Sequence, residues 1–371
     1  QRVNHNVMAI KENRYIPQVV FHPGETLAEK LAEMKMGPKE FAVRAGKPEK
    51  TIIAVMKGES SITPDMAVQF ESVTKIPAHF WMNKQRTFDE HLARERQRSI
   101  ITESIDWARN FPLAEMIKKG WLKPSESISE KTEHLLSFFG MSNPDGWRKF
   151  YFDRTLKLSF RISLAHTKEP YAISAWLRQG ELQAQELTLD KPYSEKKFKE
   201  TLPLIKSLMA KHPKDFQKDL QVLCLEAGVK VVYTPCLPKA PINGATRWLD
   251  DTPFIQLTGR YKRNDIFWFT FFHEAGHILL HGKKDVFLEN IEYPDKTDAK
   301  EQQADDFAVN WTLSKEEEKE ILSKGSITSE EVRTYAEKFN THPAIIIGRL
   351  QHNGYIPYSA GKEFIEKVEL E

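Results

Sequence analysis

Cysteine and uninterrupted apolar segments are both scarce in this sequence, and their scarcity excludes several classes of protein. The 371 residues include two cysteines, Cys224 and Cys236, which are too few for a disulfide-stabilised scaffold. The longest apolar run, 266–280, contains two histidines and a glutamate, so it is too short and too polar to span a bilayer. The first 17 residues have no apolar stretch of the kind found in a signal peptide. We therefore expect a cytoplasmic protein with free thiols and no membrane partner.

Neither sign of charge dominates the chain. Lys and Arg number 54, Asp and Glu number 52, and the net charge is +2, so composition alone does not favour a nucleic-acid partner. Residues 39–57, however, contain five basic residues and two acidic ones. Such a local excess can follow a phosphate backbone, although it is also typical of an ordinary solvated surface.

Proline and glycine divide the N-terminal part into short helices. Turn residues at Gly37-Pro38, Gly46-Lys47-Pro48, Gly58 and Thr63-Pro64 separate segments in which apolar residues recur at helical spacing, and Ile76-Pro77 opens a longer, more charged segment. The pattern predicts five helices between His22 and about Arg98. Residues 1–17 look like a flexible tail, and residues 18–98 are the predicted helix-turn-helix domain.

The rest of the chain divides into a helical part and a mixed part. Residues 99–215 carry helical periodicity without recognisable chemistry, which predicts a mostly helical connector. From 216 onward the pattern gives a helix to 227, short strands at 229–233, 243–249 and 253–257, and a long helix at about 263–281. We predict an α+β, mostly α fold, with a C-terminal zincin-like domain at 216–371 that has a small sheet and an active-site helix.

The long helix contains the most specific chemical pattern, His273-Glu274-Ala275-Gly276-His277. On a helix, His273 and His277 lie one turn apart on the same face, so both imidazoles can bind one metal ion. Glu274 lies roughly 100° around the helix. Its carboxylate can reach a water molecule at the metal and act as general base during attack on a carbonyl. Two core histidines on an amphipathic helix are the alternative interpretation.

A third ligand is predicted on a downstream helical segment. Glu301 can point at the ion, and Asp305, one turn further on, can accept a hydrogen bond from a ligand histidine without contacting the ion. The reverse assignment of these two carboxylates stays open. Two His and one carboxylate leave a position for water, as in catalytic zinc sites, although the same donors also suit non-haem iron. His281 is interpreted as a helix-end histidine in the outer shell rather than a fourth ligand. Arg247, Arg260, Tyr261 and His342 are candidate oxyanion donors, each of which also has a structural interpretation.

Around these residues the sequence resembles the ImmA/IrrE family of zinc metallopeptidases. The resemblance rests on Phe269–His281, on Glu301–Ala308 and on Leu223–Val229 upstream. It implies zinc held by His273, His277 and Glu301, with Glu274 as base. Members of this family are known for cleaving helix-turn-helix repressors, which implies a protein or peptide substrate, either a repressor or the chain itself.

The N-terminal part resembles the Cro/C1-type (XRE) helix-turn-helix of HigA-like antitoxins. The resemblance rests on residues 22–25, 46–52, 62–65 and 76–81. It implies double-stranded operator DNA as a partner, a toxin as a further one, and a homodimer, since such proteins pair on palindromic sites. The third helix would enter the major groove with Lys50 and Thr51 at base edges, while Lys39, Lys47 and Lys57 contact phosphates. Ile53 either contacts a thymine methyl there or marks a helix that binds protein instead.

Two functions follow from these features. The first is a transcriptional regulator that binds DNA and carries a zinc endopeptidase cleaving itself, for example within 92–98, or a partner regulator. The second is a non-enzymatic antitoxin-like scaffold whose zinc pocket senses a ligand or partner. The open metal position and Glu274 favour the enzyme, whereas Ile53 and the lack of a clear oxyanion donor favour the scaffold. A secreted digestive protease is excluded by the expected cytoplasmic location.

Overall fold

The computed structural model describes residues 20–152, 169–238, 240, 242–284, 287–288, 298–325 and 327–370. The predicted tail at 1–17 lies outside the described residues. The chain forms two compact units, residues 1–103 and residues 104–371, and each is described by itself. Among the described residues, none of the helices combines the length and the apolar content that crossing a membrane requires.

The N-terminal unit consists of five helices, as the sequence predicts. They are α1 (Pro23–Glu33), α2 (Pro38–Arg44), α3 (Glu49–Met56), α4 (Pro64–Thr74) and α5 (Ala78–Glu103). Side chains cap the first turns, since the Nδ1 atom of His22 accepts from the amide of Gly24 and Thr63 accepts from that of Met66. The fifth helix ends at Glu103 rather than near Arg98, and in the added turn the hydroxyl of Ser99 donates to Glu103 and that of Thr102 to the carbonyl of Arg98.

One apolar core holds these five helices together. Its fully buried members come from every helix: Leu27, Phe41, Ile52, Val55, Phe70 and Trp81. Gly24 allows α1 to approach α3 closely, because a Cβ atom there would lie 1.8 Å from the backbone oxygen of Val55. The position of α3 is therefore set by packing on its inner face, and its other face is left to solvent.

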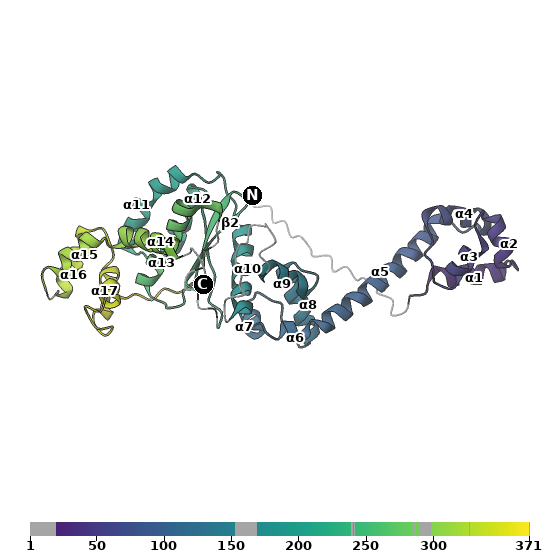
Figure 1. Cartoon of the computed structure of the whole chain (residues 1–371), viewed down its shortest axis with the longest axis horizontal. Coiled ribbons are helices and arrows are strands. Elements are labelled where there is room, and N and C mark those ends of the chain that lie inside the picture. The colour runs from purple at the N-terminus through teal and green to yellow at the C-terminus, as the bar shows by residue number, and fades with distance from the viewer. Residues whose placement is uncertain are drawn as a thin grey trace, which may run out of the picture. The chain divides into compact units, whose positions relative to one another are not determined.

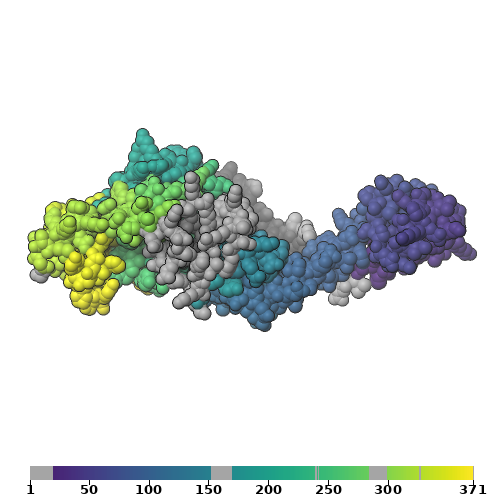
Figure 2. Space-filling view, in the orientation of Figure 1, coloured from purple at the N-terminus to yellow at the C-terminus, as the bar shows by residue number. Residues whose placement is uncertain are grey.

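The C-terminal unit contains twelve further described helices around a small sheet. They are α6 (Ile105–Ala108), α7 (Leu113–Lys118), α8 (Ile128–Phe139), α9 (Pro144–Phe152), α10 (Pro170–Glu186), α11 (Glu195–Lys211), α12 (Phe216–Glu226), α13 (Asn264–His281), α14 (Asp298–Thr312), α15 (Lys315–Leu322), α16 (Ser329–Lys338) and α17 (Pro343–His352). Helices α15 to α17 form one end of the surface of this unit (Figure 2). The predicted fold class, α+β and mostly α, is confirmed.

The sheet has four strands in the order β1-β3-β2-β4. They are β1 (Lys230–Tyr233), β2 (Gly244–Leu249), β3 (Thr252–Leu257) and β4 (Phe287–Leu288). Strand β3 runs parallel to β1 and antiparallel to β2, with Thr246 opposite Ile255. Figure 1 shows α13 and α14 on one side of this sheet and α10 on the other.

The helices predicted as a connector are built into this unit. Helix α11 contributes Phe198, Leu202, Ile205 and Met209 to the same core as Trp268 and Phe271 of α13. Helix α10 packs on the sheet, where Gly180 leaves room for the Gln256 side chain. The boundaries at residues 98 and 215 stay predictions, but these helices share cores with the residues after 216.

The last described residues run alongside the start of α13. Between residues 361 and 370, which we call the C-terminal strap, Phe364 and Val368 are buried in the core. The amide of Asn264 donates to the carbonyl of Glu366 at 3.1 Å, and the amide of Val368 donates to the carbonyl of Lys262 at 3.3 Å. The strap thereby satisfies a backbone donor of the first turn of α13, which has no partner within the helix.

Candidate metal centre

Helix α13 places two imidazoles side by side in the interior. His273 and His277 are one turn apart and only 2% and 1% exposed, and their Nε2 atoms lie 3.0 Å apart. The helix is apolar around most of its circumference, with Trp268, Phe271 and Phe272 fully buried. Packing on several sides fixes the rotation of the helix, so the two imidazoles are held in place by the core.

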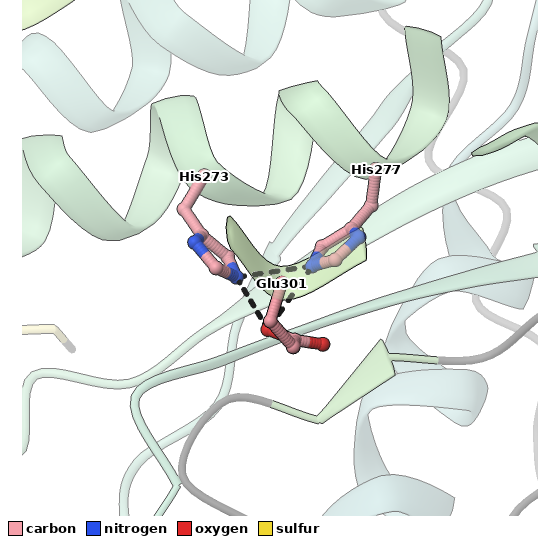
Figure 3. Close-up of side chains that lie close together, drawn as sticks. All are labelled: His273, His277 and Glu301. Carbon is pink, nitrogen blue, oxygen red and sulfur yellow. Dashed lines mark hydrogen bonds and ion pairs between the residues drawn. The ribbon is translucent and has the colours of Figure 1, made fainter. Parts of the chain in front are cut away.

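Glu301 of α14 completes the group (Figure 3). Its Oε2 atom lies 3.2 Å from Nε2 of His273 and 3.6 Å from Nε2 of His277. The close approach of α14 depends on Gly276, because a Cβ atom there would lie 3.2 Å from the side chain of Phe307 and 3.3 Å from Ala304. Among the described residues, these three side chains form a group that could hold a metal ion, because one ligand atom of each lies within 4.8 Å of the others.

The donor set fits a zinc ion. Ligands at 2.0–2.1 Å in a tetrahedral arrangement are about 3.3 Å apart, which is close to the three distances in this group. An imidazole that binds a metal does so through a nitrogen without a proton, so the three atoms that converge are all electron-pair donors. Within the described part of the chain, the buried Oε1 atom of Glu301 has no hydrogen-bond partner. A cation between the three side chains would be bound by the two Nε2 atoms and by Oε2 of Glu301.

The protonation states of His277 and Glu301 at neutral pH suit the binding of a cation. Burial lowers the pKa of His277 to about 4, so this imidazole is neutral at pH 7. Burial by itself raises the pKa of Glu301, but the close contacts with the imidazoles of His273 and His277 outweigh that effect and hold the pKa at about 2. At neutral pH the site therefore offers one carboxylate and at least one neutral imidazole.

The outer nitrogens of the two imidazoles face different partners. Nδ1 of His273 lies 2.9 Å from Oδ1 of Asp305, and Nδ1 of His277 lies 3.0 Å from Nδ1 of His281. Of the two carboxylates that the sequence leaves open, Glu301 thus faces the inner nitrogens and Asp305 an outer one. This is the arrangement in which Glu301 binds the ion and Asp305 orients a ligand.

Glu274 lies next to the group and is held by strand β2. It is 0% exposed, and the hydroxyl of Thr246 lies 2.6 Å from its Oε2 atom. Gly244 makes room for it, because a Cβ atom there would lie 2.8 Å from Oε1. The sequence did not indicate a role for Thr246 or Gly244. The signal that could have found them is the presence of small and polar residues in the predicted strand that contains both.

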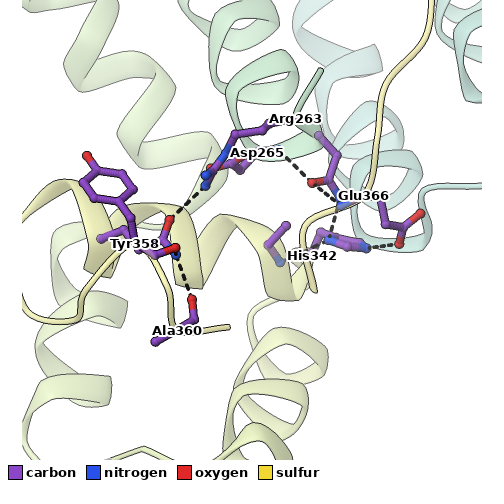
Figure 4. Close-up of polar contacts among 9 residues, drawn as sticks. Arg263, Asp265, His342, Tyr358, Ala360 and Glu366 are labelled. Atoms are coloured by element: carbon purple, nitrogen blue, oxygen red, sulfur yellow. Dashed lines mark hydrogen bonds and ion pairs between the residues drawn. The ribbon is translucent and has the colours of Figure 1, made fainter. Parts of the chain in front are cut away.

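The candidate oxyanion donors lie elsewhere. Arg247 points to the opposite face of the sheet, where it donates to the carbonyl of Leu177 on α10. His342 caps α17, pairs with Glu366 at 3.3 Å and belongs to the polar network at the start of α13 (Figure 4). The Arg260 guanidinium stacks on the half-exposed ring of Tyr261. These contacts support the structural interpretation of each side chain.

The residues predicted to contact DNA lie on α2 and α3, in the turn between them, and at Lys57 directly after α3. Lys39, Lys50 and Lys57 are exposed, and Lys47 and Thr51 are half-buried. Lys50 and Thr51 belong to the first turn of α3, and Ile53 on the same helix is 36% exposed. The arrangement is that of a helix whose first turn faces solvent.

A comparison with known protein families gives a match over the part of the chain that contains the candidate metal centre. The family model of the IrrE N-terminal-like domain, a peptidase family, matches residues 224–351. No curated protein gives a significant match.

Solved structures of antitoxins are similar to the N-terminal part. They include an antidote protein of a plasmid maintenance system from Nostoc punctiforme (29% identity, 22% of this chain and 88% of that chain). A HigA-family antidote protein from Coxiella burnetii is 31% identical over 22% and 91% of the two chains. Antitoxin HigA from Pseudomonas aeruginosa, solved with the higBA promoter, is 28% identical over 21% and 86%. The TM-score is 0.21 in each case. Residues 224–351 thus match the model of the IrrE N-terminal-like domain, a peptidase family, and the N-terminal part of the chain is similar to HigA-type antitoxins.

Proposed function

We propose that the chain is a DNA-binding transcriptional regulator of the antitoxin or repressor type whose C-terminal unit is a zinc endopeptidase. The observation on which this depends is the convergence of His273, His277 and Glu301, with Glu274 on the adjoining helical position. The match to the model of a peptidase family supports the same assignment. The proposed substrate is a protein, either a partner regulator or the chain itself.

In this proposal each residue has a defined task. His273, His277 and Glu301 hold the ion, and zinc, when bound, supplies a Lewis acid that lowers the pKa of water and polarises a carbonyl. Glu274 accepts a proton from the attacking water and passes it to the leaving amine as the C–N bond breaks. The hydrogen bond from the Thr246 hydroxyl holds the Glu274 carboxylate in a fixed orientation.

The proposed cut within residues 92–98 lies in the helical part of α5. Backbone groups there are bonded within the helix, and the pairs Glu90–Arg94 and Glu95–Arg98 strengthen it. Cleavage at this site therefore requires local unwinding, which favours a regulated event over continuous self-digestion.

DNA binding is proposed for α2 and α3. Lys50 and Thr51 in the first turn of α3 are placed for base edges, and Lys39, Lys47 and Lys57 for phosphates. We propose a homodimer on a palindromic operator, since helix-turn-helix proteins pair in this way. A toxin is a further proposed partner, and a reducing, cytoplasmic location agrees with free Cys224 and Cys236.

The test compares the full chain with its Glu274→Gln variant. Both proteins are loaded with zinc, incubated alone and with a library of denatured and native proteins, and examined by intact-mass spectrometry. We expect fragments from the wild type only, with a loss of at least about 100-fold in rate for the variant, because a general base contributes that much. Elemental analysis checks that the variant retains its zinc.

The alternative function, a non-enzymatic scaffold with a ligand-sensing zinc pocket, also has a specific observation in its favour. Glu274 is 0% exposed and hydrogen-bonded to Thr246, and the four candidate oxyanion donors make structural contacts. Zinc bound in both proteins with no cleavage by either would select the scaffold.

A further inference from the structure

His281 and Gln303 continue the hydrogen-bond pattern of the metal centre outward. His281 lies one turn beyond His277 on α13, and its Nδ1 atom is 3.0 Å from Nδ1 of His277. On its other side, Nε2 of His281 is 3.0 Å from Oε1 of Gln303. Gln303 comes from α14, two residues after Glu301. The two helices that supply the proposed ligands are thus also joined through a neutral amide and an imidazole.

The chemistry of these three groups determines where the protons are. An amide oxygen only accepts, so Nε2 of a neutral His281 carries its proton toward Gln303. Nδ1 of His281 is then an acceptor, and Nδ1 of His277 must be the donor across the 3.0 Å contact. A neutral imidazole has one N–H, so Nε2 of His277 is left with a free electron pair that points at His273 and Glu301.

We propose that His281 and Gln303 are positioning residues that set the tautomer and ring orientation of His277 for metal binding. This inference rests on the proposed metal site and assigns a role to two residues outside it. Asp305 faces Nδ1 of His273 and acts there as a charged acceptor. The two imidazoles are therefore oriented by different partners, one by a carboxylate and the other by an imidazole that contacts an amide.

The geometry separates this role from that of a fourth ligand. His281 contacts the outer nitrogen of His277, whereas the proposed ion lies at the inner nitrogen, Nε2. Both nitrogens of His281 are engaged away from the ion, one by His277 and the other by Gln303. Under the proposal, loss of the Gln303 amide oxygen lowers the affinity for the ion, although the imidazoles of His281 and His277 lie between the amide and the ion.

The first test measures zinc affinity of the full chain by competition with a chromophoric chelator. Gln303→Leu removes the amide oxygen that accepts from His281, and Gln302→Leu, at the exposed neighbouring position, is the matched control. His281→Leu removes the imidazole between Gln303 and His277. His281→Asn is its control, because it keeps an amide oxygen near the place of Nδ1. We expect zinc binding to weaken by about 10- to 100-fold in His281→Leu, which removes a direct partner of a proposed ligand, and by about 10-fold, the lower end of that range, in Gln303→Leu, which acts through His281. The zinc affinity of Gln302→Leu and of His281→Asn should stay within about threefold of the wild-type affinity, which is less than the loss expected when a partner of a ligand histidine is removed.

The second test observes the tautomer directly and needs no metal. Nitrogen-15 NMR of histidine-labelled, metal-free protein distinguishes a protonated Nδ1 from a protonated Nε2, and the signals of His277 are assigned by their loss in His277→Asn. We expect the Nδ1–H form in the wild type and a mixture of both forms in Gln303→Leu.

The outcomes separate this inference from the proposed function. Equal zinc affinity of Gln303→Leu and Gln302→Leu, or an effect of His281→Leu without one of Gln303→Leu, would overturn this inference while leaving the metal site intact. Absence of zinc binding by the wild type would overturn the metal site, and the NMR comparison would still decide the tautomer of His277.

Discussion

At the scale of single residues, His212 shows how the interior restricts protonation. It ends α11 in the left-handed region at φ 40°, and the indole N–H of Trp268 donates to its Nδ1 atom at 3.0 Å. Burial, together with the nearby His342, lowers the pKa of His212 to about 4, although Glu366 acts in the opposite direction. A protonated His212 would lose its acceptor function toward Trp268.

The stability of the protein should therefore depend on this histidine in acid. The unfolded chain binds a proton at about pH 6.5 and the folded one only at about pH 4, so lowering the pH between these values favours the unfolded state. We expect this group to remove about 1–2 kcal/mol from the free energy of unfolding, after allowance for its partial exposure. Urea unfolding at pH 7 and pH 5 should show a smaller fall in His212→Asn, since Asn tolerates the left-handed conformation. An identical fall in both proteins would contradict the assignment.

At the scale of elements, α3 and its flanking turns provide a graded test of DNA binding. On a DNA sequence selected from a random pool, Lys39→Ala and Lys57→Ala should weaken binding to all sequences and each lower the slope of log affinity against log salt by about 1. Lys50→Ala should instead change the preferred sequence, because base contacts carry specificity. Arg86→Ala, at an exposed position on α5, is the control. Fluorescence anisotropy at several salt concentrations measures all four, and an unchanged slope in both phosphate variants would argue for a protein-binding helix.

The elements also show what the sequence could and could not predict. The helices of the N-terminal unit, the strands β1 to β3 and α13 were predictable because Pro, Gly and apolar periodicity are local signals. The spacing of His273 and His277 fixes their common face in the same local way, whereas the choice between Glu301 and Asp305 stayed open because both carboxylates lie on one helical segment.

The partners that come from other elements were not predictable. Thr246 reaches Glu274 across 28 positions of sequence, which requires the register of β2 against β3 and the rotation of α13 above it. Gln303 reaches His281 only because α14 lies along α13. Arg247 of β2 contacts α10 because successive side chains of the strand point to opposite faces of the sheet. Long-range packing sets these contacts, and no local pattern reports it.

At the scale of the whole molecule, the family match is shorter than the folded unit. A fragment of residues 224–351 lacks α10, α11 and the C-terminal strap, so it would expose core residues of α13 and leave the buried guanidinium of Arg247 without the Leu177 carbonyl. We expect this fragment to be unfolded or aggregated by circular dichroism and gel filtration. A fragment of residues 104–371 should unfold cooperatively and bind zinc as the full chain does. Native zinc affinity in the shorter fragment would contradict this expectation.

The C-terminal strap has a practical consequence for anyone who isolates the protein. Its carbonyl at Glu366 accepts from the amide that begins the histidine-bearing helix, and its Val368 side chain fills the core. Exopeptidases in a lysate that trim past these residues would deprive that helix of its anchor. A preparation with a ragged end would therefore contain molecules that differ in the rigidity of the metal centre, and intact mass is the quality check to make before any assay.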